Sequence, residues 1–574
     1  MRSKTKNYMQ NNWILILLSL SFITHQFYYI LKGGNTWDEN IDIYGTGKTI
    51  EKFKYFITNQ EMSEFSNFTA EYFGQLIKLP IYVISKSQPI NNIFLEFLQL
   101  ILEKELLYIE SFFYLRHYLL NFYIFISIFI MYYFLNKVTR SVNLTLLVLF
   151  FIFSNPIFIG HSMFNSTDIP YAIQLFLASI VYFERFILKK TIDNRDLLLV
   201  GIFFGLSLLI RINAIAFLLP LVVYNLVLNF KKLNYKNFFK QHFNLMIVAL
   251  LTLILGTPGL YIDPVIYIRR VFWAQFQQDW FGYFYMNGNL YLSTDNNFDF
   301  LSKVIFYKLP LTILILFLIG LFKLKKTQSH LFKYSYFFLL YTIIAHIIFS
   351  PVTYNYFRHY LFLIPFLSLS SGFVLYDLIK NRTKQFQVFT LLFVAGYILF
   401  TQTGLEQYKY VYLNELVDEK NISVECSENY ELNGCGYWQT DYYGFSGKET
   451  INLVENLSFN NVYICDPTFT YGMYIHDNKF WEVKNGNPDF DDYGFWDQYQ
   501  YLYQIEHLSE YIEQNSTGSF YALAIHAPGY KTCKFDKLSF DFGSFNCHII
   551  ETVKRRMRGT SFALNYVHLC EYSL

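Results

Sequence analysis

Charged residues are scarce in this chain. Of its 574 residues only 16% are charged, 53% are hydrophobic, and the formal net charge is +2. The mean hydropathy of +0.23 is too high for an ordinary soluble protein of this length. No long basic run is present, so nothing in the sequence points to a nucleic-acid partner. The composition predicts a multi-pass membrane protein.

Cysteine is absent from the first 425 residues. All six cysteines come later, at Cys426, Cys435, Cys465, Cys533, Cys547 and Cys570. An even number of cysteines confined to one polar region is typical of an oxidising compartment. We expect disulfides there, Cys426 with Cys435 being one pairing, and six free thiols are the alternative.

Nucleotide and metal motifs are also missing. The sequence has no Walker loop, no glycine-rich dinucleotide motif and no serine elbow, so a nucleotide-driven mechanism has no support. No helical His-x-x-x-His or paired-cysteine spacing is present, and no metal site or cofactor is predicted. A divalent cation bound by Asp38, Glu39 and a histidine is an open alternative.

Apolar segments of membrane-spanning length recur through the first 401 residues. A hydrocarbon core of about 30 Å needs roughly 20 apolar residues per helix. The segments lie at about 12–31, 112–135, 143–160, 169–188, 197–228, 243–262, 303–323, 333–350, 359–379 and 384–401. Arg211 and Asn213 interrupt the segment 197–228, which we read as two short helices with Arg211 at their apex, because a charge at the bilayer centre is costly. The prediction is therefore about eleven transmembrane helices.

The distribution of lysine and arginine predicts on which side of the membrane each loop lies. Lys4 and Lys6 precede the first span, and most lysines and arginines between later spans fall in loops assigned to the same side. The positive-inside rule then places the amino terminus in the cytoplasm, and an odd number of spans places residues 402–574 outside it. A bacterial inner membrane is the favoured setting. Residues 1–401 form the membrane module, with external loops at about 32–110 and 263–303.

The carboxyl-terminal region reads as a small α/β unit. A helix is predicted in "SGKETINLVENL", followed by a strand in "NVYICD", and the order repeats with "HLSEYIEQ" and "SFYALAIH". The expected fold class is an all-α polytopic membrane protein with a small α/β extracytoplasmic domain.

An adjacent acidic pair follows the first span. Asp38 and Glu39 lie about seven residues beyond it, near the external interface. A carboxylate at the mouth of a membrane cavity can act as general base towards an incoming hydroxyl. The alternative is a solvated turn, and Asp42 is expected to be a loop carboxylate.

Arginine and histidine open two later spans on the same side. Arg116-His117 and Arg358-His359 share this pattern, and Arg211 lies at the same face. The planar fork of donors on arginine suits a lipid phosphate, whereas interfacial snorkelling is the alternative.

A polar hairpin, "NPIFIGHSMFNSTDIPYA", separates two further spans. His161, Asn165 and Asp168 are candidate cavity-lining residues. Asp168 is expected to cap the helix that follows, because Ser, Thr, Asp and an early Pro are typical of a helix start.

Several of these segments resemble membrane glycosyltransferases of the GT-C fold, in the branch that contains protein O-mannosyltransferases (glycosyltransferase family 39) and bacterial aminoarabinose transferases. The similar segments are Asp38-Glu39, "RHYLLN", "GHSMFNSTDIP", "LSLLIRINAIAFLLPL", "YKLP", "FRHYLFLIPFL", "YVYLNELV" and "YWQTDYYGFSGKE". The resemblance implies a polyprenyl-phosphate sugar donor, membrane lipids as surroundings and inversion at the anomeric carbon.

The resemblance also implies residue roles. Asp38 matches the acidic residue that serves as base or acceptor partner, with Glu39 beside it. Arg358 matches a basic residue implicated in holding the donor phosphate, and Arg211 and His359 are further matches. Where the family commonly has a lysine before the aspartate of the third segment, Thr167 stands here. The repeat-rich insertion of eukaryotic protein mannosyltransferases is missing, which argues against a protein acceptor.

Two other functions fit the same composition. A polytopic transporter or lipid flippase also has many spans and a few intramembrane charges, but the sequence shows no repeat relating two halves. A structural membrane protein with a disulfide-bonded external domain would tolerate substitution of Asp38 and Arg358.

Overall fold

The computed structural model describes most of the membrane module and parts of the carboxyl-terminal region. The described residues are 2–59, 75–103, 108–418, 441–455, 462–464, 519–525, 537–540 and 543–573, with short gaps in the longer ranges, and also Leu106, Ile422 and Trp438.

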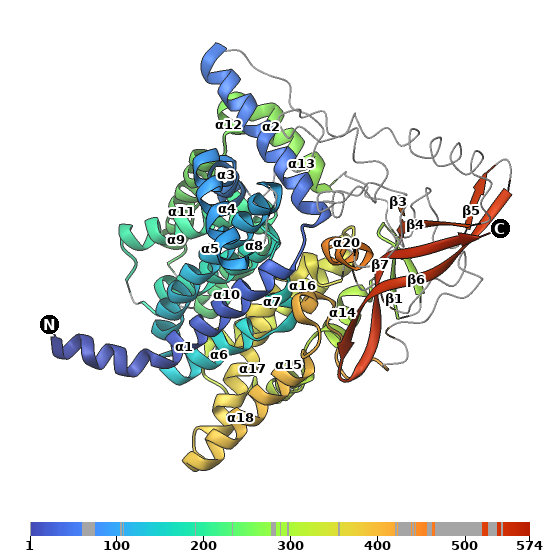
Figure 1. The fold of residues 1–574 in the computed structure, drawn as a ribbon. Helices are drawn as coiled ribbons and strands as arrows, with labels where there is room; N and C mark the ends of the chain where they lie inside the picture. The colour runs from blue at the N-terminus through green and yellow to red at the C-terminus, as the bar shows by residue number, and fades with distance from the viewer. Residues whose placement is uncertain are drawn as a thin grey trace.

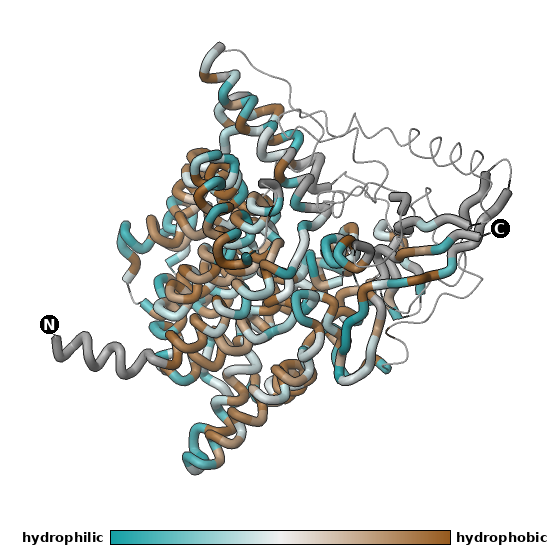
Figure 2. The backbone as a smooth tube through the Cα atoms, in the orientation of Figure 1, coloured by the Kyte–Doolittle hydropathy of each residue, from teal (hydrophilic) through white to brown (hydrophobic). Residues whose placement is uncertain are grey.

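Apolar helices form a bundle in the membrane module (Figure 1), and hydrophobic residues predominate along them (Figure 2). The bundle contains α1 (Arg2–Lys32), α5 (Tyr108–Thr139), α6 (Val142–Phe153), α7 (Pro156–Ser162), α8 (Asp168–Tyr182), α9 (Asn194–Ile210), α10 (Ala214–Asn229), α11 (Tyr235–Gly256), α14 (Phe300–Lys308), α15 (Leu311–Lys323), α16 (His330–Phe349), α17 (Leu363–Ile379) and α18 (Lys384–Thr401). Every apolar segment predicted from the sequence contains a helix, and Arg211 ends α9 just before α10 begins. The predicted class of a polytopic, mostly helical membrane protein is confirmed.

The number of clear spans is smaller than eleven. Among the described residues, five helices are long and apolar enough to cross a membrane: α1, α5, α11, α16 and α18. Two bent pairs raise the total to seven, α6 with α7 at 65° and α14 with α15 at 118°. Each break has a proline at the start of the second helix: Pro156 is the first residue of α7, and Pro310 directly precedes α15. Proline favours the start of a new helix over the continuation of an existing one. Helices α10 and α17 are apolar but shorter.

Helix α8 lies at the centre of the bundle. It packs against α5, α9, α10 and α17, and all of its residues are buried. A helix buried on every side must satisfy its polar residues inside the protein. Its amino-terminal end therefore provides a buried polar position within an otherwise apolar body.

The two predicted external loops contain regular structure. The first holds α2 (Trp37–Asn59), α3 (Gln75–Lys86) and α4 (Gln88–Leu102), and the second holds α13 (Pro264–Phe276) and the antiparallel strands β1 (Tyr283–Met286) and β2 (Asn289–Leu292). The short helix α12 (Gly259–Ile262) comes just before the second loop, at the end of the predicted span 243–262. Helix α2 projects from the bundle beside α12 (Figure 1).

A five-stranded sheet forms the core of the carboxyl-terminal region. Its strands are β3 (Val462–Ile464), β4 (Ser519–Ile525), β5 (Lys537–Phe540), β6 (Gly543–Met557) and β7 (Thr560–Ser573), in the order β3-β4-β7-β6-β5, and α20 (Gly447–Glu455) precedes them. Strands β3 and β4 are parallel and the other neighbours are antiparallel. The predicted helix at 446–457 and the strands at 461–466 and 519–526 are confirmed, whereas the predicted helix at 507–514 lies outside the described residues.

Disulfide bonding is present in this sheet. Cys570 on β7 is disulfide-bonded, as expected for an oxidising compartment. The expected pairing of Cys426 with Cys435 lies outside the described residues.

The carboxyl-terminal region packs closely on the membrane module at two glycines. A Cβ on Gly160 would overlap the backbone of Tyr410, which lies in the short helix η4 (Glu406–Val411). A Cβ on Gly33 would overlap the ring of Phe445, whose ring centroid lies 5.1 Å from that of Phe164. Glycine is therefore required at both positions for this approach.

Candidate functional site

The acidic pair after the first span lies at the start of α2, and Glu39 closes a capping box there. The Glu39 backbone N–H donates to Thr36 Oγ1 (3.4 Å), and the Thr36 N–H donates to Glu39 Oε2 (2.9 Å). Glu39 is buried, and its other oxygen lies 2.6 Å from Nε2 of His117 on α5. Asp38 occupies the first turn of α2, and its side chain lies outside the described part of the structure.

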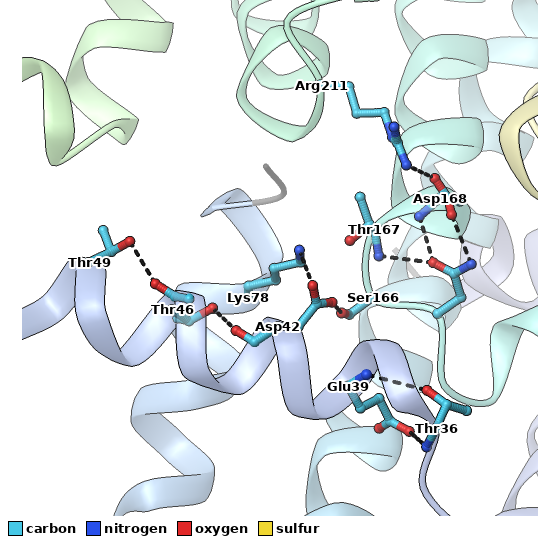
Figure 3. A network of polar contacts seen from close by, with 12 residues as sticks. Thr36, Glu39, Asp42, Thr46, Thr49, Lys78, Ser166, Thr167, Asp168 and Arg211 are labelled. Carbon is cyan, nitrogen blue, oxygen red and sulfur yellow. Dashed lines mark hydrogen bonds and ion pairs between the residues drawn. The ribbon is translucent and has the colours of Figure 1, made fainter. Parts of the chain in front are cut away.

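Asp42 is part of a buried ion pair. It lies on α2 one turn after Asp38, so the prediction of a loop carboxylate is wrong. Its Oδ1 accepts a hydrogen bond from Lys78 Nζ of α3 (2.6 Å), and its Oδ2 accepts one from Ser166 Oγ (3.0 Å). Figure 3 shows this carboxylate between Lys78 and Ser166. A loop was expected at Asp42 because the expectation did not use the capping box of Thr36 and Glu39, which begins α2.

Asp168 joins two arginines from distant parts of the chain. It forms ion pairs with Arg211, at the end of α9, and with Nε of Arg358 (3.2 Å), in the short helix η3 (Arg358–Tyr360). The expectation that Asp168 caps α8 is wrong, because Asp168 is the first residue of α8 and its carboxylate bonds to the side chains of Asn165, Arg211 and Arg358. Asn165 satisfies the helix start instead: its Oδ1 accepts from the N–H groups of Thr167 (3.2 Å) and Asp168 (2.8 Å), and its Nδ2 donates to Asp168 Oδ2 (3.0 Å).

Two histidines and a lysine lie close to this ion-pair group. His161 Nδ1 lies 3.4 Å from Asn165 Nδ2. His359 is near enough to Asp168 for electrostatic interaction. Lys308 also acts electrostatically on His161, and its buried ammonium lies 4.4 Å from the centroid of the Tyr356 ring.

Arg116 lies with the α2 carboxylates rather than with the other arginines. Its buried guanidinium interacts electrostatically with Glu39 and Asp42, and it lies 5.7 Å from the centroid of the Phe112 ring. Its Nε and Nη1 atoms have no hydrogen-bond partner among the described residues. Buried guanidinium nitrogens without partners suit an anion that the described chain does not supply.

The two groups form one continuous polar region. We define the α2 group as Glu39, Asp42, Lys78, Arg116 and His117, and the Asp168 group as His161, Asn165, Asp168, Arg211, Arg358 and His359. The segment 165–168 joins them, since Ser166 bonds to Asp42 (Figure 3) and its neighbour Asn165 bonds to Asp168. Both signs of charge are thus present inside an apolar bundle, an arrangement able to hold an anionic head group and to move a proton.

Three residues in this region were missed by sequence reasoning: Asp42, Lys78 and Lys308. The T-x-x-E spacing of Thr36 and Glu39 is a readable helix-start signal, and it would have placed Asp42 on a helix. Lys78 is a single lysine in the apolar run "QLIKLPIYVI", and Lys308 lies in "YKLP". An isolated charge in an apolar stretch is a usable signal for both.

No group of three or more histidine, cysteine or acidic side chains suited to a metal ion occurs in the described part of the chain. The proposed divalent cation therefore has no ligand set in that part, and Asp38, one of its suggested ligands, is not among the described side chains.

Comparison with known proteins gives structural likenesses but no match by sequence. The sequence matches no family model, and no curated protein matches it. Among solved structures, the chain is similar to the crystal structure of ArnT from Cupriavidus metallidurans bound to undecaprenyl phosphate, with a TM-score of 0.48 and 9% sequence identity, covering 98% of each chain. At that similarity the function has to be argued from the site residues of this chain.

Proposed function

We propose that this protein is an integral membrane glycosyltransferase that transfers a sugar from a polyprenyl-phosphate donor to an acceptor at the membrane surface. The observation that carries the proposal is the buried ion-pair group of Asp168 with Arg211 and Arg358, adjoining the Asp42–Lys78 pair inside an apolar helical bundle. A polyprenyl phosphate has an apolar tail and an anionic head, which match an apolar bundle and buried arginines. The motif resemblance to GT-C glycosyltransferases supports the same reading.

The donor phosphate is assigned to the arginines. Arg211 and Arg358 converge on one carboxylate, and Asp168 fixes the orientation of both guanidinium groups. When the bond between the anomeric carbon and the phosphate oxygen breaks, negative charge develops on the leaving phosphate. Preorganised cations in a site shielded from water stabilise that charge strongly.

The acceptor is assigned to the first turns of α2. In the proposed single displacement, the acceptor oxygen attacks the anomeric carbon from the side opposite the phosphate, and its proton passes to a carboxylate. Asp38 is the proposed base. Asp42, one helical turn later, is the second candidate because its carboxylate already bonds to Lys78 and Ser166. The sugar and the acceptor class, whether lipid, glycan or protein, are left open in this proposal.

The first prediction tests this assignment by transfer assays. Full-length protein reconstituted in liposomes is incubated with radiolabelled polyprenyl-phosphate sugars, and transfer or hydrolysis is measured. We expect Asp38→Asn to lower turnover by about 10²-fold or more, the usual loss when a general base is removed. Glu51→Gln is the matched control, because Glu51 is a half-exposed carboxylate on the same helix.

Two results would contradict the proposal at different levels. Wild-type turnover by Asp38→Asn together with a large loss for Asp42→Asn would move the base to Asp42. No release of any labelled sugar by the wild-type protein, combined with movement of the intact lipid between leaflets, would replace the transferase by a flippase.

A further inference from the structure

The long hairpin of β6 and β7 ends in a basic turn. The sequence there is "KRRMRG", Lys554 to Gly559. Arg558 (φ 54°) and Gly559 (φ 95°) both have left-handed backbone conformations between the paired residues Met557 and Thr560. Two left-handed central residues make a tight reversal whose twist matches that of the strands. We refer to residues 554–559 as the hairpin tip.

The hairpin tip is fixed against the end of a membrane helix. The Arg556 N–H donates to the carbonyl of Gly404 (3.3 Å), three residues beyond Thr401, where α18 ends. Gly404 has a φ of +87°, and a Cβ there would lie 2.7 Å from the Arg556 carbonyl oxygen. Arg558 donates to the carbonyl of Val417 (3.1 Å). The tip is therefore held at the level where α18 leaves the membrane, on the side of the carboxyl-terminal domain.

The tip contains four basic residues, Lys554, Arg555, Arg556 and Arg558, which differ in their surroundings. Arg555 pairs with Glu449 and lies 4.7 Å from the centroid of the Tyr408 ring, so it joins the hairpin to the rest of the domain. Lys554 and Arg556 are exposed instead. Neither makes an ion pair with an acidic side chain in the described part of the structure.

Exposed apolar residues precede Gly404, the residue that the tip contacts. The last turn of α18 exposes Leu399 (59%) and Phe400 (66%), as a helix in contact with lipid would. The Thr403 N–H bonds to the Phe400 carbonyl, so the chain runs without a break from the apolar surface to the Gly404 contact. Cations next to an apolar helix end lie at the depth of lipid phosphates.

We propose that the hairpin tip binds the phosphate head groups of acidic phospholipids in the leaflet on the side of the carboxyl-terminal domain, through Lys554 and Arg556. The charge is complementary, and the site is continuous with the lipid-facing surface of α18. This surface is separate from the Asp168 group, and its role does not depend on the proposed transferase activity.

The second prediction is tested by measuring how far the hairpin tip is shielded from water. Ser561 is exposed and pairs with Arg556 across the hairpin, so Ser561→Cys provides a position for a nitroxide label. The full-length labelled protein is placed in nanodiscs of phosphatidylcholine alone or of an equal mixture with phosphatidylglycerol. We expect the label to lose collisions with a water-soluble relaxation agent in the acidic nanodiscs, and the double variant Lys554→Glu/Arg556→Glu to abolish that loss.

The control reverses two charges elsewhere. Lys325 and Lys326 are exposed in the connection between α15 and α16. Their double change to glutamate alters the net charge equally and should leave the signal at the tip unchanged. Equal collision rates in the two nanodisc types would overturn the proposal, as would a lipid effect that survives charge reversal at Lys554 and Arg556. Gly404→Ala, which leaves both charges in place but disturbs the contact, should weaken the lipid effect.

Discussion

At the scale of single residues, Asp168 is a buried charge that is stabilised by its ion pairs. A carboxylate at 3% exposure would be strongly destabilised alone, but two arginines from different helices balance its charge. Both arginines are themselves largely buried, at 15% and 13% exposure for Arg211 and Arg358. Each charge therefore depends on the others being present.

The third prediction concerns this dependence. Asp168→Asn should lower the free energy of unfolding by about 3 kcal/mol, because it leaves the buried guanidinium groups of Arg211 and Arg358 without the carboxylate that they share. Arg211→Ala should lower it less, since Asp168 keeps Arg358 as its partner and the two remaining charges offset each other. Thermal unfolding of the detergent-purified protein, followed by tryptophan fluorescence, measures both.

A loss of stability in Arg211→Ala as large as that in Asp168→Asn would contradict the shared pairing of the two arginines with Asp168.

Residues of the site differed in how far the sequence could predict them. Arg211, Arg358 and Asp168 were identifiable because charges in apolar segments are rare and costly. Their pairing was not, since Arg358 lies 190 residues from Asp168 along the chain. The Asp42–Lys78 pair was missed for the same reason, since the two residues are 36 apart and meet only through the packing of α2 beside α3.

At the scale of elements, hydropathy predicted the apolar helices well. Strands β3 and β4 were also predicted, whereas β1, β2, β5, β6 and β7 were not. Each apolar run became a helix because a backbone in lipid must bond within its own segment. The hairpin β6–β7 was not predicted, although its Arg-Gly turn between alternating residues was a usable signal. Its pairing with β4 could not be read from sequence, because β4 and β7 are separated by the β5–β6 segment.

The fourth prediction concerns the packing of α7 against η4. Gly160→Ala should lower the free energy of unfolding by about 1–3 kcal/mol, since the added methyl group meets the backbone of Tyr410 and only movement of one element can relieve the overlap. Gly396→Ala in α18 is the matched control, because no atom lies within 4 Å of the added Cβ. It should be neutral or stabilising by up to about 1 kcal/mol, as alanine favours a helix interior.

Chemical unfolding of the purified variants measures the difference. Equal stability of Gly160→Ala and Gly396→Ala would contradict the tight packing of α7 on η4.

At the scale of the whole molecule, η4 joins the carboxyl-terminal region to the first span. Lys409 of η4 lies 2.7 Å from Nε2 of His25 on α1, and its ammonium lies 4.8 Å from the centroid of the Tyr29 ring. Burial lowers the pKa of Lys409 from 10.5 to about 8. The junction between the two parts of the molecule therefore contains a lysine that loses its proton more easily than a lysine in water.

The fifth prediction follows from this shift. Between pH 8 and 10.5 the unfolded chain binds the Lys409 proton more tightly than the folded protein does, so the free energy of unfolding should rise with pH across that interval. Thermal midpoints of the detergent-purified protein, measured across this range, test the expected slope. In Lys409→Met the contribution of this group to the slope should vanish, and an identical slope in both proteins would contradict the assignment.

The contact of Phe445 with Gly33 has a consequence for how the protein is made. Gly33 leaves the ribosome early, just after the first span, whereas Phe445 follows only after the last membrane helix. The turn that leads into α2, and with it the acidic start of that helix, is thus completed by a residue from near the end of synthesis. The site is therefore completed only after the carboxyl-terminal region has been made and Phe445 has packed against Gly33, so an interrupted chain would lack a finished site.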